Sequence, residues 1–375
     1  MAGQRPVEIK ALSGARALPP LLLVLYHFGE GHHYQHAFWY DALVAKGYLW
    51  VEFFFVLSGF ILTHVYGQQA KGDFRYLSFL RARLARLYPL HFFMLFAILG
   101  LMVLLRFLAA QGGYVSIYDQ PYHPMNTWQG FVTSLFLVQA WNILPYLTFN
   151  GASWFVSVEF LLCLLFPIYL FLSRGGAARG ALLIVAGGAG LAALAATSGH
   201  GLDLTFHDGI YRGMAGFAVG VGLAMVYRQA MQRGADRLPA WFFTLSQIAA
   251  LLLLLFAIYR MGWAHKPADV YVALAMAALI FTLAFDRGGV ARFLQTRPML
   301  TLGSWSYAIY MGQTLWLQLL RYFEQRWYPN VDPGAIWWIE PMSLLAVCIV
   351  WGALLAKFIE HPANAWLRRR LIRKG

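Results

Sequence analysis

The sequence predicts an all-α, polytopic membrane protein, a helix bundle with about ten transmembrane helices. Hydrophobic residues make up 60% of the chain, charged residues only 12%, and the mean hydropathy is +0.57. A soluble domain carries about twice this charged fraction. Several apolar runs reach about 17 residues or more, which is long enough for a helix to cross a bilayer. These runs lack the alternating pattern of barrel strands, so helices are expected.

The spans follow one another along the chain with polar or basic residues between them. Ten are expected: Ala11–Phe28, Gly47–Gly67, Leu87–Ala109, Trp154–Ser173, Ala181–Thr197, Gly209–Arg228, Ala240–Tyr259, Asp269–Phe285, Leu302–Leu320 and Ala335–Ile359. No linker separates a second soluble domain. Residues 1–375 are therefore expected to form a single integral-membrane domain.

The basic residues support this order of spans. They precede the first span and follow the second, fourth, sixth, eighth and tenth: Arg5, Lys10; Lys71, Arg75, Arg81, Arg83, Arg86; Arg174, Arg179; Arg233, Arg237; Arg287, Arg292, Arg297; Arg368, Arg369, Arg370, Arg373 and Lys374. All of these loops fall on one side if ten helices alternate. Because loops rich in Lys and Arg stay in the cytoplasm, both the N and C termini are predicted to be cytoplasmic.

A shorter apolar stretch, Thr127–Trp141, precedes the fourth span. Its length is typical of a re-entrant or interfacial helix. An eleventh crossing here would place Arg174 and Arg179 outside and would invert every later loop. The charge pattern therefore favours a short helix near residues 127–141 that does not cross.

The remaining composition excludes some classes of function. The net charge of +13 lies mainly in short loops, where the positive-inside rule explains it without a nucleic-acid partner. Cys163 and Cys348 fall within apolar spans, so no disulfide framework is expected. His32, His33 and His36 share one loop without a nearby cysteine, so no metal site is expected.

The first span carries Arg16 near one end and His27 near the other. A charged or titratable side chain within a membrane span costs about 2.5–3.5 kcal/mol on insertion scales, so its presence suggests a function. Eleven residues of helix cover about 16 Å, more than half of the hydrocarbon thickness. One helix can thus place a cation near one face and an imidazole near the other.

Depth along the spans predicts a polar set near the outer face. His27 ends the first span, Glu52 lies about one turn into the second, and Glu159 lies about 8 Å below the outer end of the fourth. Such groups face a bundle interior or a water-filled cavity. Four further residues from three spans are candidates for binding the substrate: Trp154, Arg212, Tyr310 and Gln313.

A second polar set is predicted on the cytoplasmic side. It contains Arg16 and the residues around the start of the third span, Arg81, Arg83, Arg86, Tyr88 and His91. Arg83 and Arg86 are three residues apart and share a helix face. Guanidinium groups bind phosphates through paired hydrogen bonds, so the cluster suits a donor with several phosphates. A simple positive-inside anchor is the alternative, but it leaves the buried Arg16 unexplained.

Together the two sets predict a transfer mechanism. A phosphate-bearing donor docks on the arginines, and its reactive end extends toward His27. There the imidazole acts as a general base on an acceptor hydroxyl or as a transient acyl acceptor. A carboxylate such as Glu52 or Glu159 orients it, and Arg16 also supports the reaction. The alternative for His27 is an ordinary interfacial residue at a helix end.

The motifs of the chain resemble those of the membrane acyltransferase-3 family, which includes many bacterial O-acyltransferases of surface glycans. Six motifs occur in the family's order: Arg16 with His27, Gly47–Phe60 with Glu52 at its acidic position, Arg81–Pro89, Trp154–Glu159, Leu302–Met311 and Ile359–Pro362. The resemblance implies acyl-CoA on the cytoplasmic side, an acceptor outside, and an essential histidine in the first helix. It also implies that the arginine element contacts CoA phosphates.

The chain departs from the family pattern at two positions. Gln313 stands where the family commonly has histidine, and Phe155 stands where it has serine. We expect a multi-pass O-acyltransferase of the bacterial inner membrane that uses acyl-CoA, with acetyl-CoA favoured, as co-substrate. The expected acceptor is an extracytoplasmic polysaccharide or lipid-linked saccharide. A transporter or exporter without acyl chemistry is the alternative, although no internal symmetry of the chain favours it.

Overall fold

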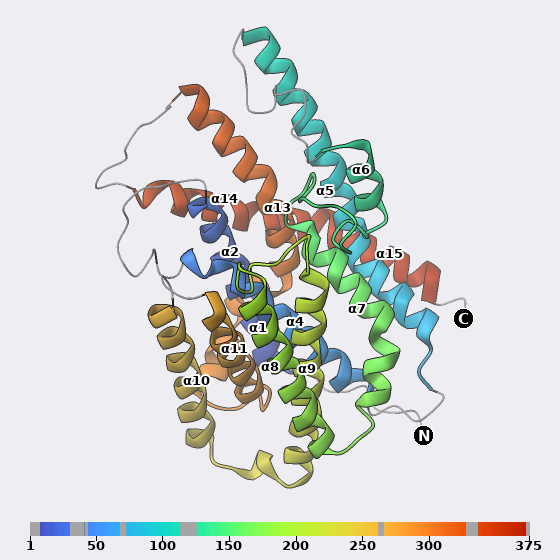
Figure 1. Cartoon of the computed structure of the whole chain (residues 1–375), viewed down its shortest axis with the longest axis vertical. Helices are drawn as coiled ribbons and strands as arrows, with labels where there is room; N and C mark the ends of the chain where they lie inside the picture. The colour runs from blue at the N-terminus through green and yellow to red at the C-terminus, as the bar shows by residue number, and fades with distance from the viewer. Residues whose placement is uncertain are drawn as a thin grey trace.

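A computed structural model describes residues 8–30, 41, 44–67, 73–112, 126–261, 266–327 and 337–372. Within these ranges the chain is helical and contains no strand, as predicted (Figure 1). The first half contains α1 Lys10–Ala15, α2 Leu18–Gly29, η1 Gly47–Leu49, α4 Trp50–Tyr66, α5 Tyr76–Gly112, α6 Trp128–Leu135 and α7 Ser153–Leu172. The second half contains α8 Ala177–Thr197, α9 Gly209–Gln232, η2 Ala235–Arg237, α10 Ala240–Met261, η3 Lys266–Ala268, α11 Asp269–Leu283, α12 Gly289–Leu294, α13 Arg297–Trp327, α14 Ile339–Leu355, η5 Ala356–Glu360 and α15 His361–Ile372.

Nine helical segments of the described chain are long and apolar enough to cross a membrane. They correspond to nine of the ten predicted spans, so the polytopic bundle is confirmed. The predicted span Leu302–Leu320 lies within α13, which is long enough but is interrupted by polar residues such as Ser304, Ser306 and Gln313. Both cysteines are free and buried, in agreement with the absence of a disulfide framework.

The first span is broken, whereas a single continuous helix was predicted. α1 ends at Ala15 and α2 begins at Leu18, so Arg16 lies in the link between two helices. Pro19 and Pro20 stand at the start of α2, where they lack the N–H groups that would bond back to α1. The break therefore follows from the proline pair, and it places the Arg16 guanidinium inside the bundle.

The third span begins earlier than predicted. α5 starts at Tyr76 and is 37 residues long, so three arginines assigned to a loop before Leu87 lie within a helix: Arg81, Arg83 and Arg86. Leu, Ala and Arg favour helices strongly, and the hydropathy of the apolar part alone did not reveal this extension. The last span is also longer than predicted. A π-helical turn, η5, continues α14 into α15, which packs against α5.

The stretch before the fourth span forms a short helix, as predicted. α6 has 8 residues, which is too short to cross a bilayer. Thr127 caps it by accepting a hydrogen bond from the Gly130 amide at 3.0 Å. The helix ends earlier than residue 141, and the chain continues in turns where Leu137, Asn142 and Phe149 adopt positive φ.

Glycines allow α4, α8 and α9 to pack closely at the centre of the bundle. A Cβ atom on Gly220 would overlap the Val56 carbonyl of α4, and one on Gly222 would overlap the Gly180 carbonyl of α8. Small residues permit such close approach between membrane helices. The C-terminal ends of α5 and α13 project beyond their neighbours at one end of the bundle (Figure 1).

Candidate active site

Three neighbouring cavities follow one another through the bundle. The vestibule is lined by Glu8, Leu12, Ser13, Arg16, Ile61 and His64. The arginine cavity is lined by Arg16, Arg83, Arg86, Glu159, Tyr307 and Tyr310, among others. The histidine cavity is lined by His27, Glu30, Trp154, Asp203, Tyr310 and Arg321, among others. Arg16 lines both the vestibule and the arginine cavity, and Tyr310 lines both the arginine and histidine cavities.

The two outermost cavities lie at opposite ends of the same helices. The vestibule contacts Glu8 before α1 and Val65 at the end of α4. The histidine cavity contacts Glu30 after α2 and Val51 at the start of α4. A line of cavities therefore leads from one end of the bundle to the other.

Among the residues that the structure describes, the arginine cavity holds one ion pair and two guanidinium groups without a partner. Arg83 Nη2 donates to Glu159 Oε1 at 2.7 Å, and Ser58 Oγ donates to the same oxygen at 3.0 Å. Arg16 and Arg86 form no hydrogen bond or ion pair with any residue that the structure describes. These two cations are free to bind a ligand.

The charges around the arginine cavity favour an anion. Glu360, at the end of the π-helical turn, is buried and attracts both Arg16 and Arg86. Its Oε2 has no hydrogen-bond partner among the described residues. Three guanidinium groups thus face two carboxylates, Glu159 and Glu360, which leaves an excess of positive charge. Guanidinium groups in such a setting bind phosphates and carboxylates strongly.

The histidine cavity contains an oriented imidazole. His27 Nδ1 lies 2.8 Å from Glu30 Oε2, and Tyr26 Oη donates to Glu30 Oε1 at 2.7 Å. A carboxylate only accepts hydrogen bonds, so Nδ1 carries a proton, and in the neutral ring Nε2 then has a lone pair. The His27 side chain is 31% exposed and lines the histidine cavity.

Electrostatics keep the Glu30 carboxylate ionised. Burial acts to raise the pKa of Glu30, but the hydrogen bonds from His27 and Tyr26 and the charge of Arg321 outweigh it. The pKa of Glu30 therefore lies below its usual value. Arg321 also approaches the end of α2, where its Nη2 donates to the His27 carbonyl at 3.4 Å.

The rest of the histidine cavity is roomy and has both polar and apolar walls. Its volume is about 710 Å³, and its walls include Asp203, Thr314 and Gln318 together with the rings of Phe149 and Trp154. Burial raises the pKa of Asp203 above its usual value. Such a mixture of aromatic faces and hydrogen-bonding groups suits a hydroxylated organic molecule.

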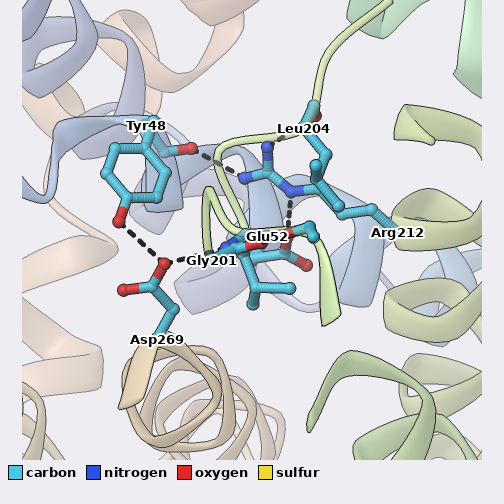
Figure 2. A network of polar contacts seen from close by, with 8 residues as sticks. Tyr48, Glu52, Gly201, Leu204, Arg212 and Asp269 are labelled. Carbon is cyan, nitrogen blue, oxygen red and sulfur yellow. Dashed lines mark hydrogen bonds and ion pairs between the residues drawn. The ribbon is translucent and has the colours of Figure 1, made fainter. Parts of the chain in front are cut away.

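A buried network supports the wall of this cavity (Figure 2). The Arg212 Nε donates to Glu52 Oε1, and both side chains are fully buried. Arg212 also donates to the carbonyls of Leu204 at 3.0 Å and Tyr48 at 2.8 Å. The guanidinium lies 5.6 Å from the centre of the Trp154 ring, a cation–π contact that fixes the indole.

A second buried group anchors the loop between α8 and α9. Asp269 accepts hydrogen bonds from Lys46 Nζ at 2.6 Å, Tyr48 Oη at 2.7 Å and the Leu202 amide at 2.8 Å. Tyr48 belongs to both networks, through its carbonyl and its phenol (Figure 2). The loop that carries Asp203 is therefore held by hydrogen bonds between its backbone and two side chains, Arg212 of α9 and Asp269 of α11.

Comparisons with known proteins identify the family of the chain. A profile of the acyltransferase domain family, the acyltransferase-3 type, matches residues 9–357, nearly the whole chain. The chain belongs to the acyltransferase-3 family. This membership confirms the resemblance seen in the motifs, and it identifies the chain as a multi-pass membrane acyltransferase.

Several curated proteins are similar to this acyltransferase. "Acyltransferase MdmB" of Streptomyces mycarofaciens is 27% identical over 98% of the chain and 94% of its own length. "Putative peptidoglycan O-acetyltransferase YrhL" of Bacillus subtilis (strain 168) is 24% identical over 94% of the chain. The chain spans only 54% of YrhL. No solved structure matches the chain.

The acyltransferase brings together some of the predicted cytoplasmic residues but not all. Arg16, Arg83 and Arg86 line one cavity. The exposed Arg81 instead donates to the Leu371 carbonyl at 3.3 Å, and Tyr88 donates to the Leu135 carbonyl at 3.0 Å. On a helix, positions 81 and 88 lie opposite positions 83 and 86. The prediction that Arg81 and Tyr88 join the donor site is therefore wrong in its geometry.

The predicted outer set is also corrected. Glu159 pairs with Arg83 in the arginine cavity, and Glu52 pairs with Arg212, so neither carboxylate orients His27. Arg212 lines the histidine cavity, but its side chain is buried and bonded to Glu52 and to the Leu204 and Tyr48 carbonyls, so it supports the cavity wall.

Trp154 and Tyr310 line the histidine cavity, and their role in substrate binding stays a prediction. Gln313 is fully buried instead, with its Nε2 donating to the Tyr310 carbonyl at 3.1 Å. His32, His33 and His36 lie outside the described residues.

Sequence reasoning missed Glu30, the carboxylate that binds His27. The spacing of three residues was a usable signal, because such side chains are neighbours on a helix surface. It also assigned no role to Glu360 or Asp203, whose positions depend on the π-helical turn and on an anchored loop. Glu360 lies in the Ile359–Pro362 motif, which was a usable signal, whereas no sequence pattern indicated Asp203.

Replacing Glu30 with Gln is expected to lower the rate of acyl transfer by about 10- to 100-fold, because the imidazole loses its charged orienting partner. The Asp208→Asn variant, which changes another carboxylate of the same cavity, is the matched control. Initial rates of the two variants and the wild type provide the measurement. Equal rates for E30Q and the wild type would contradict the role assigned to Glu30.

The lowered pKa of Glu30 also predicts the pH dependence. A depressed pKa keeps the carboxylate ionised above it, so the contribution of Glu30 is lost only as the pH falls through the lowered value. The ratio of the wild-type rate to the E30Q rate should thus stay constant from about pH 8 to about pH 5 and fall in more acidic buffer. A ratio of rates that already collapses near neutral pH would contradict this assignment.

Proposed function

We propose that the chain is an O-acyltransferase of the bacterial cytoplasmic (inner) membrane. It moves an acyl group, with acetyl favoured, from cytosolic acyl-CoA to a hydroxyl of an extracytoplasmic polysaccharide or lipid-linked saccharide. One observation carries the proposal. A cavity with two unpaired guanidinium groups and a cavity with an oriented histidine share the side chain of Tyr310.

The arginine cavity and the vestibule are the proposed donor site. Acyl-CoA carries several phosphates and a long, flexible arm that ends in the thioester. Arg16 and Arg86 have free N–H groups that match phosphate oxygens, and Arg83 is held by Glu159 as a further positive charge. The vestibule opens beside α1 and the end of α4, the side predicted to face the cytosol.

His27 is the proposed base. The acceptor hydroxyl loses its proton to Nε2 while its oxygen forms a bond with the thioester carbonyl carbon. The carbon–sulfur bond then breaks, the thiolate leaves with the bonding electrons, and the proton passes from His27 to the sulfur. Glu30 keeps the imidazole in the tautomer that accepts the proton and stabilises the cation that forms.

The histidine cavity is the proposed acceptor site. Trp154 and Phe149 offer ring faces on which a sugar can stack, and Asp203 and Gln318 offer hydrogen bonds to hydroxyls. The name of the relative YrhL refers to peptidoglycan O-acetylation, which supports a saccharide acceptor for this chain.

Replacing Arg16 or Arg86 with Gln is expected to raise KM for acyl-CoA by about tenfold or more, since a hydrogen bond to a charged group contributes about 1.5–3 kcal/mol. Arg81→Gln is the matched control, because Arg81 lies on the opposite, exposed face of the same helix. Steady-state release of the free thiol measures KM. A similar rise for R81Q, or no rise for both R16Q and R86Q, would contradict the donor site.

The proposed function as a whole is tested with purified protein in lipid nanodiscs. Labelled acetyl-CoA and an envelope glycan fraction are supplied, and label is expected to appear on the glycan as an alkali-labile ester. Movement of saccharide across vesicle membranes without any acyl transfer would instead establish the transporter alternative.

A further inference from the structure

A layer of aromatic rings separates the arginine cavity from the histidine cavity. Phe54 lies one helical turn from Ser58 on α4, and Phe155 lies one turn from Glu159 on α7. Tyr310 lies one turn from Tyr307 on α13. In each pair the aromatic residue lies nearer to the histidine cavity along the helix. The three rings therefore close the arginine cavity at the same level.

Phe155 stands at the centre of this layer. Its ring centroid lies 5.9 Å from that of Phe54, 5.8 Å from that of Tyr310 and 4.8 Å from that of Phe55. The contact with Tyr310 is edge to face, with an interplanar angle of 82°. Tyr310 is only 4% exposed and lines both cavities, so the layer is one residue thick there.

Part of the wall beside the layer is apolar. Leu57 and Leu62 of α4 and Leu87 of α5 contribute to the arginine cavity, whose volume is about 130 Å³. Polar side chains line the same cavity: Arg16, Ser58, Arg83, Arg86, Glu159 and Ser306. A donor that places its charged and polar parts against these residues directs its apolar acyl end toward the rings.

We infer that Phe155 limits the length of the acyl chain that the protein transfers; this inference rests on the proposed function. In the proposed reaction the acceptor hydroxyl lies between His27 and the acyl carbonyl, so the carbonyl stops at the aromatic layer and the chain attached to it must fit beside Phe155. Each additional methylene has to displace a packed ring, and overpacking of this kind costs about 1–3 kcal/mol. The chain therefore selects short acyl groups, and Phe155 is the residue that determines this specificity.

The test compares Phe155→Ala and Phe155→Leu with the wild type on acetyl-, butyryl- and octanoyl-CoA. The readout is kcat/KM for thiol release in the presence of acceptor, and thermal melting checks the fold. Phe160→Ala is the matched control, because Phe160 lies on the same helix, stacks on Trp141 and lines none of the three cavities. The ratio of butyryl-CoA to acetyl-CoA activity is expected to rise about tenfold in F155A, less in F155L, and not in F160A.

The possible failures are distinguishable. An unchanged ratio in F155L and F155A, with acetyl transfer retained, overturns the inference and leaves the proposed function intact. If F155A does not fold, F155L and Phe54→Leu decide the matter by the same ratio. A wild-type protein that releases thiol from none of the donors overturns the proposed function and, with it, this inference.

Discussion

Replacing His27 with Ala is expected to lower acyl transfer by at least about 10³-fold while the protein still inserts into the membrane. The imidazole is the proposed proton acceptor. Among the described residues, only His27 and Tyr26 form side-chain hydrogen bonds with Glu30. The side chain is 31% exposed, so its removal leaves no buried void that would destabilise the bundle. Label transfer from acetyl-CoA to acceptor provides the measurement.

A second histidine offers a control for this experiment. His207 lines the same cavity but is largely exposed, and it lies 3.6 Å from Asp208, away from Glu30. His207→Ala should therefore keep most of the activity. Wild-type rates in a correctly inserted H27A protein would exclude His27 as the base and would require another site for the chemistry.

Replacing Arg212 with Ala is expected to lower the free energy of unfolding by about 3–5 kcal/mol, because it leaves the Glu52 charge buried without a partner. The substitution also removes the hydrogen bonds to the carbonyls of Leu204 and Tyr48. The melting temperature of the purified protein in detergent measures the effect, and size-exclusion chromatography after heating shows how much folded protein remains. The loop that carries Asp203 should also become more accessible to proteases.

Two further variants sharpen this prediction. Arg237→Ala removes an exposed arginine and should leave the melting temperature unchanged. The double variant E52M/R212M replaces the whole ion pair with apolar groups and should recover much of the stability that R212A loses. A melting temperature of R212A equal to that of the wild type would show that the Glu52–Arg212 pair does not hold the wall of the histidine cavity.

The sequence predicts the helical bundle well because apolar length and loop charge act locally. It also places Arg83 and Arg86 on one helix face, since a spacing of three residues is sufficient for that. The break at Arg16 could have been predicted from Pro19 and Pro20, whose missing N–H groups prevent a continuous helix.

The partners of the buried carboxylates could not be predicted in this way. Counting residues from the outer end of the span placed Glu159 near His27. The earlier start of α5 instead brings Arg83 to the depth of Glu159. The relative depth of these two residues depends on how α5 packs against α7. The position of Glu360 depends on the extra residue in each turn of η5, which no periodicity in the sequence reveals.

The side chain of Tyr310 stands where two cavities meet, and this has a kinetic consequence for the proposed reaction. In that reaction the acyl donor and the saccharide acceptor enter through different cavities. The free thiol can therefore dissociate toward the cytoplasm and the acylated saccharide toward the exterior, and neither product release depends on the other. Turnover should therefore proceed through a complex of both reactants formed in either order.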